Sequence, residues 1–489
     1  MLSLLVFLPV LVGLLIVAVP RLPAAAVRGL WLAATLADVA LLVALWLGYP
    51  GRGLAYQTNL RWIPSVGVGY HIGVDGLSLP LVAMTTVLFA ACAVYSLRRS
   101  DRIRGFAALF LFLETVSLGL FVSLDLILFF VFFDLSIVGM YFVIAGWGHG
   151  ERQRSALTFF LYTFVGSLAL LLGFLGLYLS ARPHTFDLVA LTRTHPATGA
   201  VGGLILLAVG VGLAIKTPTV PFHTWLPPAH TDAPAAGSAI LAGVLLKMGT
   251  YGFVRIALPV LPDSWRRYAV VAVVVGVVSV LYGALVALAQ RDVKRMVAYT
   301  SVNHMGYVLL ALGAAALPGG TAGRALAVTG AVTQMVSHGL ITGALFLLCG
   351  VLYERGNTYR MDAYGGLAGP APRFALLTAF AAFASLGLPG FSGFVAEFQI
   401  FAGSLGPAPV ATVLAVLGIV LTAALFLLAL HRIFLGAYRS PATVADLRGS
   451  EGVSAGLLVA LALVVGVLPR FLLDVIEPAA RTVVALVSR

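Results

Sequence analysis

The sequence predicts an all-α membrane protein that crosses the bilayer many times. Of its 489 residues, 61% are hydrophobic and 10% are charged, and the mean hydropathy is +1.05. No soluble domain could bury so much apolar surface. Apolar runs of about 20 residues, the length that crosses the hydrocarbon core as a helix, recur along the chain. The segments between these runs are too short to form a soluble domain.

Fourteen apolar runs qualify as candidate membrane spans. They are residues 2–20, 29–47, 77–97, 106–123, 126–147, 156–180, 200–222, 234–260, 269–290, 296–316, 325–352, 374–405, 410–436 and 452–469. No basic stretch precedes the first run, so we interpret residues 2–20 as a retained span and not as a cleaved leader. We expect the boundaries to be accurate to a few residues.

The net charge of +12 is distributed among the short segments between the spans. Arginines occur there singly or in small groups, which is typical of topology signals and not of a nucleic-acid surface. The more basic side, which carries Arg98 and Lys294, is predicted to be cytoplasmic, so both termini and the long 48–76 loop face outward. Cys92 and Cys349 lie in apolar segments without a CxxC-type motif, so we expect no disulfide framework and no metal or iron–sulfur site.

Two of the spans, residues 200–222 and 374–405, contain helix breaks near their middles. In the first, two prolines follow Lys216; in the second, a proline among several glycines precedes Glu397. Backbone groups freed at membrane depth must be satisfied by protein or water, so such breaks predict discontinuous helices beside an ion path. A packing kink would explain a proline alone, but it explains a proline beside a buried charge less well. Comparable breaks in the two halves of the chain suggest two inverted repeats.

Eight titratable residues lie inside the predicted spans. They are Asp38, Glu114, Asp134, Lys216, Lys247, His304, His338 and Glu397. A charge at the centre of a membrane helix costs about 2.5–3.5 kcal/mol on insertion scales, so each residue is a functional candidate. The lysines are the most informative, because the chain has 27 arginines and only three lysines, two of which lie in spans. A desolvated ammonium can lose its proton near neutral pH, whereas a guanidinium keeps it.

Five of these residues form the predicted main path. Asp134 and Lys216 are interpreted as a buried acid–base pair, whose separation would release a proton toward Lys247. His338 is predicted to link Lys247 to Glu397, because an imidazole titrates near neutral pH. A static bridge that fixes helix packing would explain one such pair equally well. The succession of acid, base, base, imidazole and acid along successive helices favours a proton path.

The remaining titratable residues are weaker candidates for an accessory relay. Glu114 offers a second carboxylate in the fourth span, whereas Asp38 has no evident partner and is assigned to packing. His304 is equally consistent with a relay and with a structural polar contact. His223 and His230 follow the first helix break and are expected to be structural groups or uptake-side relays. Their spacing is not a metal-binding motif by itself.

Four segments together resemble the antiporter-like subunits of respiratory complex I, the type I NADH:quinone oxidoreductase. They read KTPTVPFHTWLPPAHTDAPAAGSAILAGVLLKMGTYGFVRI (216–256), RDVKRMVAYTSVNHMGYVLL (291–310), HGLITGALFLLCGVLYER (338–355) and GLPGFSGFVAEFQIF (387–401). Similar subunits occur in multi-subunit sodium/proton antiporters and membrane-bound hydrogenases. Glu397 stands where the L and N types and the antiporter subunits usually carry lysine, and therefore favours the M type (chain 4). Residues 470–489 also leave no room for the long lateral helix of the L type.

The resemblance implies a role for each residue of the main path. Asp134 takes the place of a fifth-span glutamate, Lys216 of the seventh-span lysine and Lys247 of the central lysine. His338 corresponds to a histidine of the linking path, and Glu397 corresponds to the terminal carboxylate on the exit side.

Two departures from the family pattern affect this assignment. An aspartate in place of the fifth-span glutamate moves the carboxylate about one methylene away from Lys216, which weakens the pair or requires a water between them. Pro228 replaces the aspartate of the family's HTWLPDAH segment. Any role of that acid is therefore absent, unless Asp232 takes it over.

The resemblance also implies the function and the partners. It predicts a proton-translocating membrane-arm subunit, flanked by L-type and N-type subunits in a bacterial inner membrane and coupled to quinone reduction elsewhere. The chain itself would hold no cofactor; NADH, flavin, iron–sulfur clusters and quinone belong to partner subunits. A sodium/proton antiporter subunit, a hydrogenase subunit and a structural spacer of the membrane arm are the alternatives. The predicted divisions are N-terminal helices (1–105), two antiporter-like halves (106–260 and 261–436), and a C-terminal helix and tail (437–489).

Overall fold

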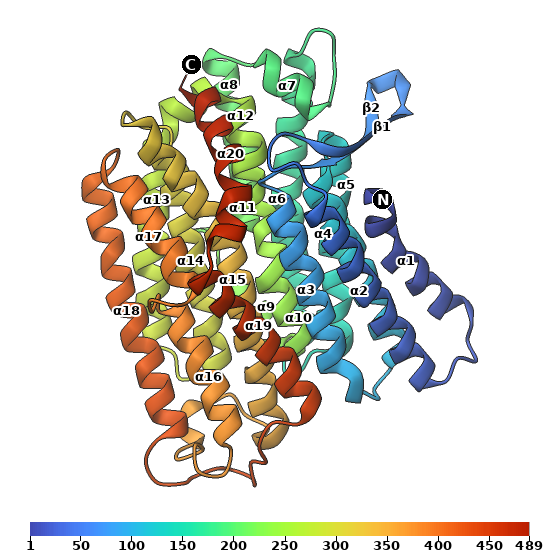
Figure 1. Ribbon diagram of the computed structural model, residues 1–489, viewed down its shortest axis with the longest axis vertical. Helices are drawn as coiled ribbons and strands as arrows, with labels where there is room; N and C mark the ends of the chain where they lie inside the picture. The colour runs from blue at the N-terminus through green and yellow to red at the C-terminus, as the bar shows by residue number, and fades with distance from the viewer. Residues whose placement is uncertain (489) are drawn as a thin grey trace.

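The computed structural model describes residues 1–488 and confirms the predicted all-α membrane architecture (Figure 1). Within these residues, 11 helices are long and apolar enough to cross a bilayer. Each predicted span coincides with one or more helices, including shorter or less apolar ones. The hydrophobic runs therefore located the long apolar helices, as expected for a chain in which nearly every apolar run crosses the membrane.

The N-terminal layer consists of four long helices and a β-hairpin. The helices are α1 (Leu2–Ala18), α2 (Ala24–Leu47), α3 (Leu79–Tyr95) and α4 (Ile103–Val122). The 48–76 segment, predicted as a loop, contains β1 (Ala55–Ile63) and β2 (Val68–Val74), which pair antiparallel. β1 is mostly exposed, so no buried face marks it in the sequence. Gly67, with φ +69°, supplies the left-handed backbone at the turn.

The first broken helix follows this layer. The elements are α5 (Leu126–Trp147), α6 (Arg152–Ser180), α7 (Leu188–Thr194), α8 (Gly199–Lys216), α9 (Leu226–Asp232) and α10 (Ala235–Ile240). The predicted break is confirmed, but α8 ends at Lys216 and not at residue 222. Pro218 and Pro221 lack the N–H that would continue the helical hydrogen bonds.

The helix that begins with α10 contains two π-helical stretches. They are η3 (Leu241–Leu245) and η4 (Phe253–Ala257), and they alternate with α11 (Leu246–Gly252) and α12 (Leu258–Val260). A π turn bonds residue i to i+5 and is often found at functional positions. These stretches rotate the faces that the following residues present, and no sequence pattern predicted them.

The second half contains the second broken helix. Its elements are α13 (Pro262–Leu288), α14 (Val293–Ala314), α15 (Thr321–Gly356), α16 (Pro372–Ser385), α17 (Ser392–Leu405) and α18 (Pro409–Phe434). The predicted break within residues 374–405 is confirmed by the gap between α16 and α17. α15 runs through the middle of the bundle and is buried along nearly its whole length (Figure 1). Outer helices such as α18 expose leucine and valine instead, as a lipid-facing surface requires.

The C-terminal segment corrects one prediction. α19 (Gly449–Val467) matches the last predicted span, but the residues beyond it, predicted as a tail, form the helix α20 (Arg470–Val487). Its buried residues Leu472, Ile476, Ala480 and Val484 recur every four positions, which gives one apolar face. That face packs against α15, so α20 belongs to the bundle. No long apolar run marks α20 in the sequence, because its other face is polar.

Candidate functional site

Lys216 lies at the first helix break. It is the last residue of α8, and its side chain is 1% exposed. The ammonium donates to Ser136 Oγ on α5 at 3.0 Å and lies 4.9 Å from the centre of the Phe133 ring. The Trp225 indole donates to the Ile215 carbonyl at 3.0 Å and so satisfies one acceptor that the break has freed. The protein itself therefore stabilises the open end of α8.

Asp134 lies close to this lysine on α5 but does not pair with it directly. Among the described residues, no carboxylate oxygen lies within ion-pair distance of Lys216. Asp134 is half-buried, and its Oδ1 is buried without a hydrogen-bond partner in the chain. The two groups therefore need a water or a movement to meet.

Lys247 lies where the π-helical stretch η3 meets α11. It is fully buried, and its Nζ donates to the Ala242 carbonyl, five residues back, at 2.6 Å. The same Nζ lies 2.6 Å from His338 Nδ1 on α15. An ammonium has no lone pair, so Nδ1 accepts this bond and a neutral His338 carries its proton on Nε2. The predicted neighbours Lys247 and His338 are therefore in direct contact.

A small polar cavity continues from His338 toward Glu397. His338 Nε2 has no hydrogen-bond partner in the described chain, and it adjoins a cavity of about 10 Å³. Gln334, Ser385 and Glu397 also line this space. A cavity of this size holds about one water. A water in this space would have both the His338 imidazole and the Glu397 carboxylate among its neighbours.

His304 on α14 lies between His338 and Glu397. Its ring centre is 5.3 Å from that of His338, and its Nε2 lies 3.7 Å from Glu397 Oε1. The same Nε2 donates to the Ser385 carbonyl at 3.1 Å. The sequence left His304 undecided between a relay and a structural contact. Its position adds it to the central group of titratable residues.

Glu397 lies on α17 just after the second helix break and is 4% exposed. Gly387 in the break has φ +79°, and a Cβ at this position would lie 2.4 Å from Glu397 Oε2. Only glycine combines this backbone with so close an approach. The break therefore creates the space that the carboxylate occupies.

A buried histidine and a buried lysine lie on the side of α9 and α10. His230 is fully buried with both ring nitrogens unpartnered, and it stacks on Phe346 with ring centres 4.5 Å apart. Lys294, assigned from the sequence to a basic surface segment, is fully buried. Its Nζ donates to the Ala233 carbonyl at 2.6 Å, at the end of α9. The sequence feature that could have indicated the burial of Lys294 is its position directly before the 296–316 span.

The other accessory candidates lie apart from this group. His223 packs against Tyr282, with ring centres 5.0 Å apart, and has an unpartnered Nδ1. Glu114 lies on α4, in the N-terminal layer. Asp232 accepts a hydrogen bond from Ser155 Oγ at 2.5 Å and so anchors α9 to the start of α6.

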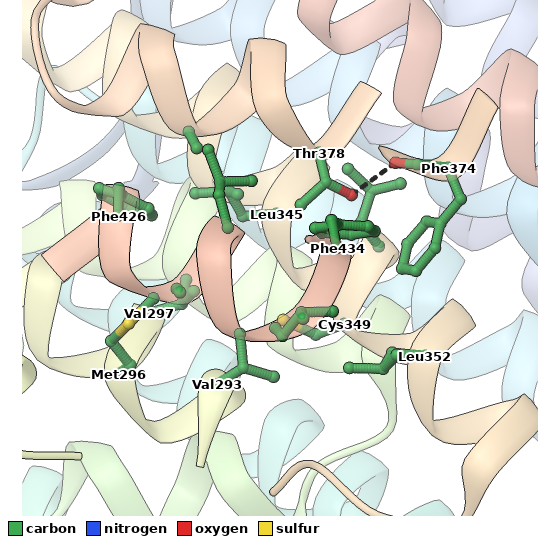
Figure 2. A pocket seen from close by; sticks show the side chains of 15 residues that line it. Val293, Met296, Val297, Leu345, Cys349, Leu352, Phe374, Thr378, Phe426 and Phe434 are labelled. Carbon is green, nitrogen blue, oxygen red and sulfur yellow. Dashed lines mark hydrogen bonds between the residues drawn. The ribbon is translucent and has the colours of Figure 1, made fainter. Parts of the chain in front are cut away.

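A second cavity, between α14, α15, α16 and α18, has a different character (Figure 2). It measures about 30 Å³ and is lined almost entirely by apolar side chains, including Val297, Leu345 and Phe426. The Thr378 hydroxyl is bonded to the Phe374 carbonyl at 2.8 Å. Apolar cavities of this kind stay dry, so this one offers no route for protons.

Comparison with known proteins places this geometry in a family. A family model described as NADH:quinone oxidoreductase/Mrp antiporter, TM, matches residues 123–422. The chain belongs to this family. It is 38% identical to NADH-quinone oxidoreductase subunit M of Rhodobacter capsulatus, over 98% of this chain and 95% of the relative. It is also 38% identical to subunit M of Escherichia coli strain K12, over 94% of this chain and 91% of the relative.

Solved structures give the same result. A chain of respiratory complex I from Thermus thermophilus with bound NADH superposes with a TM-score of 0.91 at 33% identity, with 100% of both chains covered. A chain of the Mrp complex from Dietzia has a TM-score of 0.87 at 22% identity over 99% of each chain, a similarity of fold alone. The resemblance to M-type antiporter-like subunits, predicted from Glu397 and the surrounding motifs, is confirmed.

Proposed function

We propose that this chain is the M-type membrane-arm subunit of a bacterial NADH:quinone oxidoreductase and that it translocates protons along its row of buried titratable residues. The observation that carries this proposal is the 2.6 Å contact between Lys247 Nζ and His338 Nδ1, followed by a cavity that reaches Glu397. Two basic groups share this contact at the centre of the membrane, and together they can hold and pass a proton.

The first step takes place at Lys216. Its ammonium is held by one hydroxyl and by aromatic faces, and not by a direct carboxylate. When Asp134 approaches, with or without a bridging water, its charge favours the protonated lysine; when the two separate, the lysine releases its proton more readily. The Lys216 side chain can move because a single hydrogen bond orients it. We assign to this pair the role of the switched element.

The second step takes place between Lys247, His338 and Glu397. A proton from Lys247 arrives on His338 Nδ1, and the proton on Nε2 leaves toward the cavity. One water in that space carries it to Glu397, beside His304. His304 Nε2 donates to the Ser385 carbonyl, and its ring lies beside the exit-side carboxylate. Buried His230 lies on the uptake side, and His223 and Glu114 are accessory sites.

The assembly follows from the same assignment. The chain spans the bacterial inner membrane with both termini outside the cytoplasm, and it packs between L-type and N-type neighbours. NADH, flavin, iron–sulfur clusters and quinone belong to partner subunits, which supply the redox energy; this chain contributes the membrane path. The alternative, a sodium/proton antiporter subunit, draws on the fold that this chain shares with the Mrp complex.

The test is the pair of variants Lys247→Ala and Lys247→Arg in the assembled complex. Both should lower proton pumping and coupled quinone reduction about tenfold or more, because neither side chain can release a proton to His338. The Arg variant keeps the charge and therefore separates proton transfer from electrostatic packing. Pumping at the normal rate in an assembled Arg variant would contradict the proposal. Sodium-dependent transport would instead favour the antiporter.

A further inference from the structure

Two buried carboxyl groups lie in the N-terminal layer, apart from the central row. Asp38 on α2 and Glu114 on α4 are each fully buried. All four of their carboxyl oxygens lack a hydrogen-bond partner in the described chain. An ionised carboxylate in such surroundings is costly, so polar groups of this kind are retained for a reason.

The two helices that carry them run parallel. At one end, Arg28 in the first turns of α2 donates to the Arg99 carbonyl, just ahead of α4, at 2.7 Å. At the other end, α2 leads into β1, and α4 is held to β2 by the bond from Leu124 N–H to the His71 carbonyl at 2.8 Å. Both helices therefore begin on one side of the membrane and end at the hairpin (Figure 1).

The register between α2 and α4 places the carboxyls opposite each other. The Trp31 ring on α2 packs against Phe106 and Phe110 on α4, with ring centres 5.9 and 5.5 Å apart. Asp38 follows Trp31 by seven residues, two helical turns, and so lies on the same face about 10 Å farther along. Glu114 lies eight residues beyond Phe106 and four beyond Phe110, or about 12 and 6 Å along α4, which brackets the advance of Asp38. Asp38 is also the charged side chain that acts most strongly on Glu114.

Among the described residues, no lysine or arginine faces this pair, and His71 of β2, the strand that packs on α4, is paired with Asp187 at 2.5 Å. α1 and α3 contain no Lys, Arg or His, and the titratable group of α3 that lies nearby is the buried thiol of Cys92. The basic residues of α2 and α4, Arg28 and Arg104, each precede the carboxyls by ten residues, or about 15 Å. Two other helices contact α4. Of these, α5 carries Asp134, and α11 carries Lys247, which is already bonded to a carbonyl and an imidazole.

We propose that Asp38 and Glu114 form a carboxyl pair that holds one shared proton, a proton-binding site separate from the central row. Two facing carboxyls without a cation cannot both ionise, and one proton between them forms a charge-assisted O–H···O bond. Binding adds one proton to one carboxylate and changes no other bond. The site lies at the depth of the Lys216 contact, since Leu113 packs on Gly139 of α5 near Ser136. Its charge can therefore bias Lys216, a consequence that rests on the proposed function, whereas proton binding does not.

Labelling with dicyclohexylcarbodiimide, which attacks protonated carboxyls in apolar surroundings, tests the pair in the intact complex in membranes. One member should be labelled at neutral pH, and the double variant Asp38→Asn/Glu114→Gln should lose that label. In either single variant, the remaining carboxyl should label about threefold less at neutral pH, because no partner charge opposes its ionisation. Exposed Asp362 serves as the unlabelled control.

Several outcomes would overturn the pair. Identical pH profiles of labelling in the single variants and the parent would exclude a shared proton. Absence of label on both residues from about pH 5 to about pH 9 would exclude it when the infrared carbonyl band is also unchanged in the double variant. Protection by sodium chloride would assign a sodium site instead. If the reagent does not reach the site, infrared spectroscopy tests the pair instead. The parent should show the carbonyl band of a buried carboxylic acid, and the double variant should lack it. An unchanged band would also refute the proposal. Both measurements are independent of pumping, so the proposed function can fail while the pair stands.

Discussion

Lys216 and Lys247 are both fully buried, and both lie where a regular α-helix is interrupted, but their partners differ. Lys216 has one hydroxyl partner and an aromatic neighbour, at the end of a broken helix. Lys247 is fixed by a carbonyl and an imidazole, inside a helix that continues through a π turn. A lysine with one weak partner can change position, whereas a lysine with two short bonds is pre-positioned. Under the proposed function, the Lys216 contact is the switching half of the row and the Lys247 contact is the conducting half.

The largest expected effect on proton pumping comes from a substitution that interrupts the conducting half at His338. In His338→Asn, the Oδ1 atom replaces Nδ1 as acceptor for Lys247, but the side chain has no second site from which to pass a proton. We expect proton pumping in membrane vesicles to fall about tenfold or more, with assembly unaffected.

Asn at His431 is the matched control, because this exposed ring at the end of α18 lies apart from the row. It should leave pumping within about twofold of the parent, the range expected when no proton-transfer group is lost. Equal losses in both variants would show that the defect is structural and that the conducting half does not depend on the imidazole.

Some features of the two lysine sites could be predicted from the sequence and others could not, and the difference lies in their physical origin. The helix breaks were predictable, because proline removes a backbone donor and leaves a local mark. The row itself was predictable, because charges within apolar spans are costly and stand out. The π turn that brings Lys247 to the Ala242 carbonyl was not predictable. It changes the hydrogen-bond pattern of the helix without requiring a particular residue type.

Other parts depend on contacts between distant segments. His304 joins the path only because α14 packs beside α15 and the second break, and Asp38 acquires a partner only through the register of α2 with α4. The sequence therefore left His304 undecided and assigned Asp38 to packing. Lys294 was missed for a related reason: it lies at a helix start, where topology signals and buried groups look alike.

The next effect concerns the exit carboxylate in the second break. Gly387→Ala places a Cβ 2.4 Å from Glu397 Oε2, so the carboxylate must move. We expect pumping to fall about fivefold, in addition to a stability loss of about 1–2 kcal/mol from the left-handed backbone.

Gly390→Ala is the control for this backbone cost. Gly390 also has a positive φ, +98°, but open space surrounds its Cβ position. Both variants should lower the unfolding temperature of the subunit similarly, and only Gly387→Ala should impair pumping strongly. If the two variants pump alike, the position of Glu397 is not held by this contact.

A smaller effect should come from the switching half. Ser136→Ala removes the one hydrogen bond that orients Lys216, and a bond to a charged group contributes about 1.5–3 kcal/mol. Because the lysine can find water or Asp134 instead, we expect only about a threefold loss of pumping. Asp134→Glu should act in the opposite sense, since the longer side chain reaches Lys216 directly. Ser180→Ala, whose hydroxyl bonds only to its own helix at Gly176, is the neutral control.

The smallest effect concerns the anchor of the first break outside the membrane. His149, in the turn between α5 and α6, donates through Nδ1 to the Asp232 carbonyl at 2.9 Å and thereby holds α9. Burial, and then the charge of Lys294, lowers the pKa of His149. The unfolded chain therefore binds a proton at higher pH than the folded chain, and the turn loses stability as the pH falls below about 6.5. His149→Asn keeps a donor but cannot be protonated, so acidification from about pH 7.5 to about pH 5.5 should destabilise it less, by up to about 1 kcal/mol. Protease cleavage of the turn at increasing temperature measures this, with exposed His184→Asn as control. Equal acid sensitivity in parent and His149→Asn would mean that the first break is held by Ser155 and Lys294 alone.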